Sequence, residues 1–278
     1  AASFIKAYEV FKSYGINVGG EYIEIGDSIE SVLKKFGDPG MTSENIYGLK
    51  RYVYTKDPEK FLIVSFKDDK IAEIFSNAPS LVYKNTSAKE NINSFSEFTS
   101  KATENYSEIK IKNYNMETKL FFDYSEGYRL DAVYIKDTRV TRPATSYNVM
   151  IAPYTEKELF EIINVYRYKH GLKPFGYSPD AYKSAKNYSV YMRENEFFEY
   201  IDLGGLSPFD RMKNAGIKYG TAAENIAYMT GDSINIYHYF VSSPAMKSNM
   251  LMPSLDSAGI GCTILGNRIY TVLDMFGK

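Results

Sequence analysis

The stretch TEKELFEIINVYRYKHG, residues 155–171, decides the fold of the second half of the chain. Thr155 and Glu158 form the pattern of a capping box at the start of a helix. Four apolar side chains then recur on one helical face, namely Leu159, Ile162, Ile163 and Tyr166. Gly171 stands where the helix is expected to end. The stretch therefore predicts one long amphipathic helix.

The residues after this helix predict three more helices and a β-hairpin. A second helix begins at Pro179 and carries one apolar stripe, made of Ala181, Ala185, Tyr188 and Met192. A short helix follows over residues 208–214, and a fourth runs from a cap at Asp232 or Ser233 to about residue 242. Residues 258–265 and 268–276 flank a Gly266-Asn267 turn and are predicted to pair. Helices around a small antiparallel sheet are expected.

The first half of the chain alternates helices with aromatic strands. A helix is predicted over residues 29–36, followed by a three-strand meander over 51–55, 61–66 and 71–75. A second helix over 94–105 and strands over 119–124 and 128–135 repeat this order. The repeat predicts an α+β domain of two helix-plus-meander units, although any α+β domain could alternate in this way.

A proline-containing segment without periodicity separates the two halves. We therefore predict an amino-terminal domain over residues 1–140, a linker over 141–153 and a second domain over 154–278. The chain begins Ala1-Ala2-Ser3 without an initiator Met, which fits a mature form whose signal peptide or anchor has been removed. A boundary introduced for expression would look the same.

The composition argues against binding to nucleic acid or to an anionic membrane surface. The 278 residues include 33 Lys and Arg against 34 Asp and Glu, so no excess of positive charge is available to displace counterions from phosphates. The apolar runs are far shorter than the roughly 20 residues that span a bilayer, so no transmembrane segment is expected. A lone Cys262 provides no intrachain disulfide.

Seven short motifs lie in order between residues 154 and 278: Ile163-Asn164 with Arg167, Gly171-Leu172-Lys173-Pro174, Ser207-Pro208 with Arg211, Ala215-Gly216, Ala223-Glu224-Asn225-Ile226-Ala227, Ser243-Pro244-Ala245 with Asn249 and Leu251, and Gly259-Ile260-Gly261. Together they resemble the CAP superfamily, also called the SCP-like domain, in its bacterial extracellular form. The resemblance implies an α-β-α sandwich, export from the cell and a role at or beyond the envelope.

The first half resembles the domain that often precedes a CAP domain in Gram-positive bacteria. Its clearest marks are Ile25-Gly26-Asp27-Ser28 and Phe36-Gly37-Asp38-Pro39. The resemblance implies an accessory or targeting role for residues 1–140.

Family members with an intact central cleft carry two histidines and acidic residues that can hold a divalent metal. In this sequence Glu224 is present, but Tyr200 and Met246 stand at the two histidine positions. A phenol and a thioether beside one carboxylate are a poor ligand set for zinc, which takes about four ligands from Cys, His and carboxylates. No metal and no cofactor are therefore expected.

Other reactive residues also admit structural roles. His238 lies in the fourth predicted helix and could face the cleft, or could be a surface histidine, and His170 is placed to cap the first helix. Cys262 is expected to be a buried, inert thiol, and Ser242 and Ser243 are expected in turn or cap positions. No nucleophile with its base is predicted.

Acidic and aromatic residues leave alternatives open. Glu199 and Asp202 could approach Glu224, as two-carboxylate hydrolysis requires, whereas Glu224-Asn225 could instead bind loop backbone and hold the cleft wall. The aromatic run from Tyr237 to Phe240 could line a groove or pack in the core.

The sequence predicts a secreted or cell-surface, non-enzymatic binding module with no catalytic residue. Its ligand-binding cleft is predicted to contain Tyr200, Glu224, Asn225, His238 and Met246. The expected partner is an envelope protein, peptidoglycan or a small apolar ligand. Two alternatives remain at this stage: a cell-wall hydrolase or peptidase that uses Glu224, with Tyr200 or His238, and a structural component of an envelope or spore layer.

Overall fold

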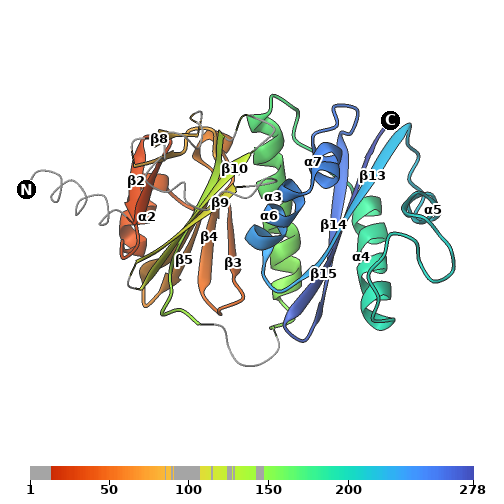
Figure 1. The fold of residues 1–278 in the computed structure, drawn as a ribbon, viewed down its shortest axis with the longest axis horizontal. Helices are drawn as coiled ribbons and strands as arrows, with labels where there is room; N and C mark the ends of the chain where they lie inside the picture. The colour runs from red at the N-terminus through yellow and green to blue at the C-terminus, as the bar shows by residue number, and fades with distance from the viewer. Residues whose placement is uncertain are drawn as a thin grey trace, which may run out of the picture. The chain divides into compact units, whose positions relative to one another are not determined.

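The computed structural model describes residues 14–84, 86–88, 90, 107–113, 115–123, 127, 129–141 and 147–278. The chain divides into two compact units, Ala1–Arg142 and Pro143–Lys278. Each unit has its own sheets and its own core, and each is described separately below (Figure 1).

The first unit contains two antiparallel sheets and one described helix. The larger sheet has seven strands in the order β3-β4-β5-β6-β11-β10-β9, and the smaller has four in the order β2-β1-β7-β8. The elements are β1 (Gly15–Val18), β2 (Glu21–Glu24), α2 (Ile29–Phe36), β3 (Met41–Glu44), β4 (Lys50–Tyr54), β5 (Leu62–Lys67), β6 (Lys70–Ser76), β7 (Val82–Tyr83), β8 (Thr86–Ser87), β9 (Ser107–Asn113), β10 (Met116–Asp123) and β11 (Arg129–Asp137).

The two predicted meanders are both present, and they join into one sheet. β6 pairs with β11 over Glu73–Ser76 and Val133–Lys136, so the last strand of the first meander lies beside the last strand of the second. β3 and β9 were not predicted: MTSE is short and mostly polar, whereas SEIKIKN alternates Ile109 and Ile111 with charged residues and carries a strand pattern that was overlooked. Both are edge strands, where polar residues protect the open edge from pairing with another chain. The predicted helix 94–105 lies outside the described residues.

The second unit is a four-stranded sheet covered by helices on both faces, as the resemblance implied. The strand order is β12-β14-β15-β13. The elements are α3 (Ile151–Lys169), β12 (Gly176–Tyr177), α4 (Pro179–Glu194), α5 (Pro208–Asn214), β13 (Thr221–Met229), α6 (Ser233–Ser242), α7 (Pro244–Met250), β14 (Ser257–Leu265) and β15 (Arg268–Gly277). Figure 1 shows α4 and α5 on one side of this sheet and α3, α6 and α7 on the other. The α-β-α sandwich is confirmed.

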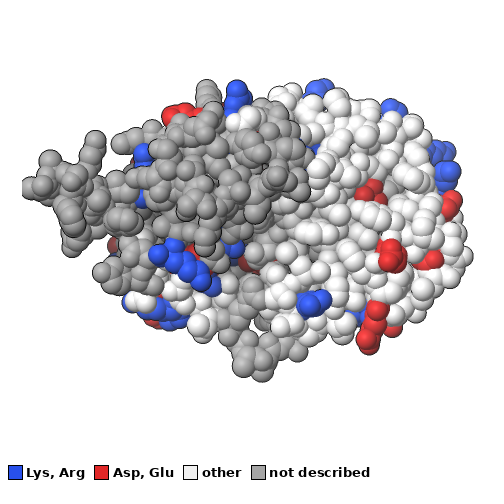
Figure 2. Space-filling view, in the orientation of Figure 1, with Lys and Arg blue, Asp and Glu red and all other residues white. Residues whose placement is uncertain are grey.

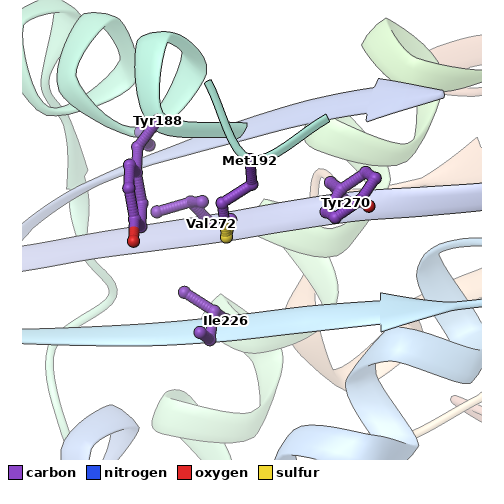
Figure 3. Close-up of a cluster of buried hydrophobic side chains, with 6 residues drawn as sticks. Tyr188, Met192, Ile226, Tyr270 and Val272 are labelled. Carbon is purple, nitrogen blue, oxygen red and sulfur yellow. The ribbon is translucent and has the colours of Figure 1, made fainter. Parts of the chain in front are cut away.

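α4 approaches the sheet closely because β14 carries two glycines where the helix crosses it. A Cβ atom added to Gly261 would lie 2.2 Å from the backbone nitrogen of Lys186, and one added to Gly259 would lie 2.0 Å from that of Tyr182. On the same face a buried cluster fills the space between helix and sheet (Figure 3). It consists of Ala185, Tyr188, Met192, Ile226, Tyr270 and Val272. The stripe predicted for α4 is therefore core.

α3 starts earlier than the sequence predicted, and the predicted capping box is wrong. The helix begins at Ile151, its N-cap Met150 makes no side-chain cap hydrogen bond, and Thr155 is buried inside the helix. Ile151 and Ala152 are buried, so packing extends the helix by one turn. Pro153 is tolerated there because the first-turn N–H groups have no partner within the helix. The last three residues of the predicted linker thus belong to α3.

Both signs of charge are present on the described part of the face drawn in Figure 2, where charged side chains are separated by uncharged residues, in line with the net charge of −1. Within the described part of the chain, every helix is too short or too polar to cross a membrane.

We predict that Gly261→Ala strongly destabilises the second unit. The added methyl would overlap backbone of α4, which cannot move as a flexible side chain can, so a loss of about 3 kcal/mol in the free energy of unfolding is expected. Gly176→Ala is the matched control, since its Cβ would lie 3.6 Å from the nearest atom. Urea unfolding of both variants measures the difference, and equal stabilities would contradict the close approach.

Candidate functional site

Glu224 of β13 is held by Arg211 of α5 in a buried ion pair. Arg211 Nη2 lies 2.9 Å from Glu224 Oε1 and 3.0 Å from Oε2, so one nitrogen donates to both carboxylate oxygens. The Glu224 side chain is 2% exposed and that of Arg211 is 10% exposed. Charge-assisted hydrogen bonds in such a position are strong. The carboxylate that the sequence singled out therefore already has a cation as its partner.

The same guanidinium holds the loop between α4 and α5. Arg211 Nη1 donates to the carbonyl oxygens of Tyr200 and Leu206, at 3.0 Å each. The guanidinium carbon lies 3.3 Å from the centre of the Tyr188 ring, a cation–π contact. The Tyr188 hydroxyl donates to the carbonyl oxygen of Glu199, 2.5 Å away. Arg211 thus connects β13, α4 and the loop that carries Tyr200.

A second buried carboxylate lies beside Glu224. Asp274 of β15 is the cross-strand partner of Glu224 in the antiparallel ladder. Burial raises the pKa of Asp274 to about 6, while Ser184, Glu224 and Arg211 act to lower it. Burial and the charge of Asp274 together raise the pKa of Glu224 well above its ordinary value, although Arg211 opposes this. Among the described residues, neither oxygen of Asp274 has a hydrogen-bond partner within ordinary distance.

Asn225 faces the other side of the sheet from Glu224, because successive strand residues point to opposite faces. Its side-chain nitrogen donates to the backbone carbonyl oxygen of Met246 at 2.9 Å, and its side-chain oxygen accepts from Asn249 at 2.9 Å. Asn225 therefore ties β13 to α7. The structure brings Asn225 and Met246 together, but through the Met246 backbone and on the face opposite to Glu224.

Tyr200 lies at the free edge of β13. Burial raises the pKa of its hydroxyl, and the charges of Glu224 and Tyr239 act in the same direction. A backbone hydrogen bond with Ile226 opposes the shift. Tyr200 and Tyr239 are both exposed, so two phenols from the loop and from α6 stand near one another at the surface. Of the predicted cleft residues, Tyr200 is the one that the structure places near Glu224.

The histidines and the cysteine have contacts that explain them structurally. His238 Nδ1 lies 3.1 Å from Ser242 Oγ, one turn further along α6. His170 Nδ1 lies 2.8 Å from the Tyr166 carbonyl oxygen at the end of α3. Cys262 is fully buried, and burial raises the pKa of its thiol far above the usual range. Ser243 caps α7 by accepting from the backbone N–H of Met246.

The residues at the cleft do not fit the divalent metal that the family implies. The two positions expected to supply imidazoles carry a phenol and a thioether, and both oxygens of Glu224 accept from Arg211. Within the described residues, no group of three or more His, Cys, Asp and Glu side chains is arranged to hold a metal ion. No chemistry of this chain is therefore derived through a bound metal.

Family comparisons agree with this architecture in both units. Residues 25–152 match the CAP-associated N-terminal domain, and residues 160–275 match the cysteine-rich secretory protein family, the CAP domain. The chain is a member of the CAP superfamily in which a CAP-associated domain precedes the CAP domain.

Two proteins of Bacillus subtilis are similar in sequence. YkwD is 34% identical over 121 residues, which cover 44% of this chain and 47% of YkwD, so the match spans about half the length of that relative. The membrane protein YlbC is 21% identical over 275 residues, covering 85% of this chain and 79% of YlbC.

Two crystal structures share the fold. An extracellular protein with an SCP domain from Bacillus anthracis has a TM-score of 0.79 at 18% identity, covering 91% of this chain and 94% of the other. A cysteine-rich secretory protein from Staphylococcus aureus has a TM-score of 0.74 at 19% identity, covering 96% and 97%.

Two residues of the site were missed at the sequence level. Arg211 was recognised only as part of a motif, and Asp274 was not considered. Asp274 could have been noticed, because it is the one acidic residue in the apolar run of residues 269–276. The partnership of Arg211 with Glu224 had no local signal, since 13 residues and a loop separate them.

We predict that Arg211→Met destabilises the second unit by about 3 to 5 kcal/mol, because Glu224 would remain buried without its cation. The double variant Arg211→Met/Glu224→Met should recover much of this loss, since no buried charge is then left unpaired. Urea unfolding of the wild type, both single variants and the double variant forms a complete cycle. A double variant no more stable than Arg211→Met would show that the ion pair is not the cause.

We also predict a pH dependence that comes from Asp274. Its pKa is about 6 in the folded protein but near 4 when unfolded, so the folded state binds more protons between these values. Stability should therefore fall as the pH rises from 4 to above 6. Asp274→Asn should reduce this fall by roughly 2 to 3 kcal/mol between pH 4 and pH 8 relative to wild type, while Glu224, whose pKa is also raised, contributes a remaining fall of the same sign. Urea unfolding at both pH values tests it; parallel curves for the two proteins would be evidence against a raised pKa.

Proposed function

We propose that this chain is a non-enzymatic recognition protein of the cell surface or exterior, in which the CAP domain is the binding module. One observation carries the proposal: both oxygens of Glu224, the remaining acidic group of the family cleft, accept hydrogen bonds from Arg211. A general acid or base has to reach the reacting atom of a substrate. Glu224 is buried, and through Arg211 it holds the α4–α5 loop against β13.

A preorganised apolar surface supports a binding role. Five large apolar side chains of the α4–α5 loop and the start of α5 are exposed: Tyr200, Ile201, Leu203, Leu206 and Phe209. We call this the 200–209 surface. Apolar residues gathered on one exposed loop are a common mark of an interaction site.

The loop that carries the 200–209 surface is internally braced. Asp202 Oδ1 accepts from the backbone N–H groups of Gly204 and Leu206, at 2.9 and 2.8 Å. Ser207 and Asp210 form a reciprocal capping box where the loop enters α5. A loop that is already ordered loses less conformational entropy on binding than a flexible one. Among the partners expected from the sequence, an envelope protein suits this surface best.

The proposed location rests on similarity. A structural neighbour from Bacillus anthracis is described as extracellular, and YlbC of Bacillus subtilis is described as a membrane protein. We assign this chain to the outside of a Gram-positive cell, where the amino-terminal unit serves as an accessory or targeting domain.

A second candidate function is cell-wall hydrolysis. It is favoured by the raised pKa of both Glu224 and Asp274, since shifted carboxyl pKa values often mark catalytic sites. Release of soluble muropeptides from purified cell walls, lost in Glu224→Gln, would establish this alternative. The burial of both carboxylates argues for the structural explanation of these shifts.

We predict that the full chain binds purified cell envelopes through the 200–209 surface. Leu203→Ser and Ile201→Ser together should lower retention on sedimented envelopes about tenfold or more, because these side chains, 66% and 51% exposed, would be buried against the partner. Leu265→Ser, which changes an exposed leucine at the end of β14, is the control and should bind as wild type. Retention unchanged in the double variant would place the binding surface elsewhere.

Zinc content tests whether the cleft holds a metal. We expect no stoichiometric zinc after equilibration and dialysis, measured by elemental analysis, because two of the family ligands are a phenol and a thioether. Zinc bound at one equivalent and lost in Glu224→Ala would overturn the proposal of a degenerate site.

A further inference from the structure

A cavity lies between α4 and α5, on the side of Arg211 away from the predicted cleft residues. Its volume is about 320 Å³, near the lower end of the range of small-ligand pockets. Neither Glu224, Asn225, His238 nor Met246 lines it. Its size suits one sugar ring or a molecule of similar dimensions rather than a polymer segment.

One wall of the cavity is a polar and aromatic stripe along α4. Lys183, Asn187 and Tyr191 are spaced by four residues, so they stand above one another on the same helical face and all line the cavity. Within the described part of the chain, no hydrogen bond or ion pair engages the Lys183 ammonium or the Asn187 amide. These groups are available to a ligand without loss of an existing contact.

The opposite wall adds a second free amide and a carboxylate. Asn214, at the end of α5, has no side-chain hydrogen bond to the described residues. Asp202 reaches the cavity from the loop, with one oxygen used by the loop backbone. An amide offers both donors and an acceptor, which is the pairing that the hydroxyl groups of a sugar require.

Two tyrosine rings of α4, Tyr188 and Tyr191, line the cavity. The Tyr188 and Tyr191 rings are nearly parallel, with an interplanar angle of 19° and centroids 6.3 Å apart. Tyr188 is held under the Arg211 guanidinium, whose charge is compensated by Glu224. Tyr188 is buried, so Tyr191, which is partly exposed, is the ring that can present an apolar face to the C–H face of a pyranose.

The charges select the kind of ligand. Lys183 is the one lining cation without a partner among the described residues, because Arg211 already neutralises Glu224. A single carboxylate matches this one positive charge, whereas a phosphate dianion would be repelled about twice as strongly by Asp202 with no second free cation to offset it. We propose that the α4–α5 cavity binds a monosaccharide unit that carries one carboxylate group. This site adjoins the 200–209 surface through Asp202 but uses none of its five exposed apolar side chains, so it goes beyond the proposed function.

The test compares two sugars that differ only in the carboxylate. Methyl β-D-glucuronide and methyl β-D-glucoside are titrated against the full chain and followed by ligand-observed NMR. We expect saturable binding of the glucuronide and affinity for the glucoside that is weaker by about threefold or more, because Lys183 contributes an exposed charge pair. Inorganic phosphate should compete poorly.

Variants assign the binding to the cavity. Lys183→Met should lower the affinity for the glucuronide to that of the glucoside, and Asn187→Ala/Asn214→Ala should weaken both sugars by about tenfold. All three residues are exposed, so the fold should persist, which circular dichroism verifies. Lys157→Met, which removes an exposed lysine of α3, is the matched control and should bind as wild type.

The outcomes separate this inference from the proposed function. Leu203→Ser should leave sugar binding intact even where it abolishes binding to envelopes. Lys183→Met should lower the affinity for the glucuronide and leave binding to envelopes intact. The inference would be overturned if neither sugar showed saturable binding. It would also be overturned if both sugars bound equally and Lys183→Met left their affinities unchanged. Stronger competition by phosphate than by the glucuronide would also overturn it.

Discussion

The buried ion pair between Arg211 and Glu224 organises the carboxyl-terminal unit around the edge of its sheet. A single guanidinium contacts the Glu224 carboxylate, two carbonyl oxygens of the α4–α5 loop and the face of Tyr188. Two buried charges of this kind are strongly destabilising when separated, because either one alone would remain unpaired in a medium of low dielectric constant. The loop, the short helix α5 and the strand β13 are therefore coupled, and both the 200–209 surface and the α4–α5 cavity depend on that coupling.

The same interaction explains how a family scaffold can persist without its metal ligands. A tyrosine and a methionine stand where the resemblance implies histidines, and Glu224 is paired with an arginine. The second carboxylate, Asp274, keeps a pKa near 6 because it is fully buried, although Glu224 and Arg211 act to lower it. The pKa of Glu224 is raised by burial and by the charge of Asp274, so both shifts have structural causes.

Local patterns predicted the helices and the central strands well. α2, α4, α5 and α6, both meanders and the last hairpin were expected within a few residues of their observed bounds. Two of the elements that were missed have weak local signals: β3 is a short polar edge strand, and β13 begins with Thr221-Ala222-Ala223-Glu224-Asn225, which has little β-propensity. β9 alternates apolar and charged residues, so its pattern could have been noticed. Because β13 was not expected to be a strand, Glu224 and Asn225 were predicted to share one cleft, although the alternation of a strand places them on opposite faces.

The sequence by itself determined the fold class and the superfamily, since these depend on residue identity and on short-range periodicity. Only the tertiary structure decided the partners of those residues. Arg211 reaches Glu224 from another element, Asn225 binds backbone of α7, and Asp274 meets Glu224 across two paired strands. Such contacts join residues far apart along the chain, and they are selected by the packing of helices on a sheet, which no local pattern encodes.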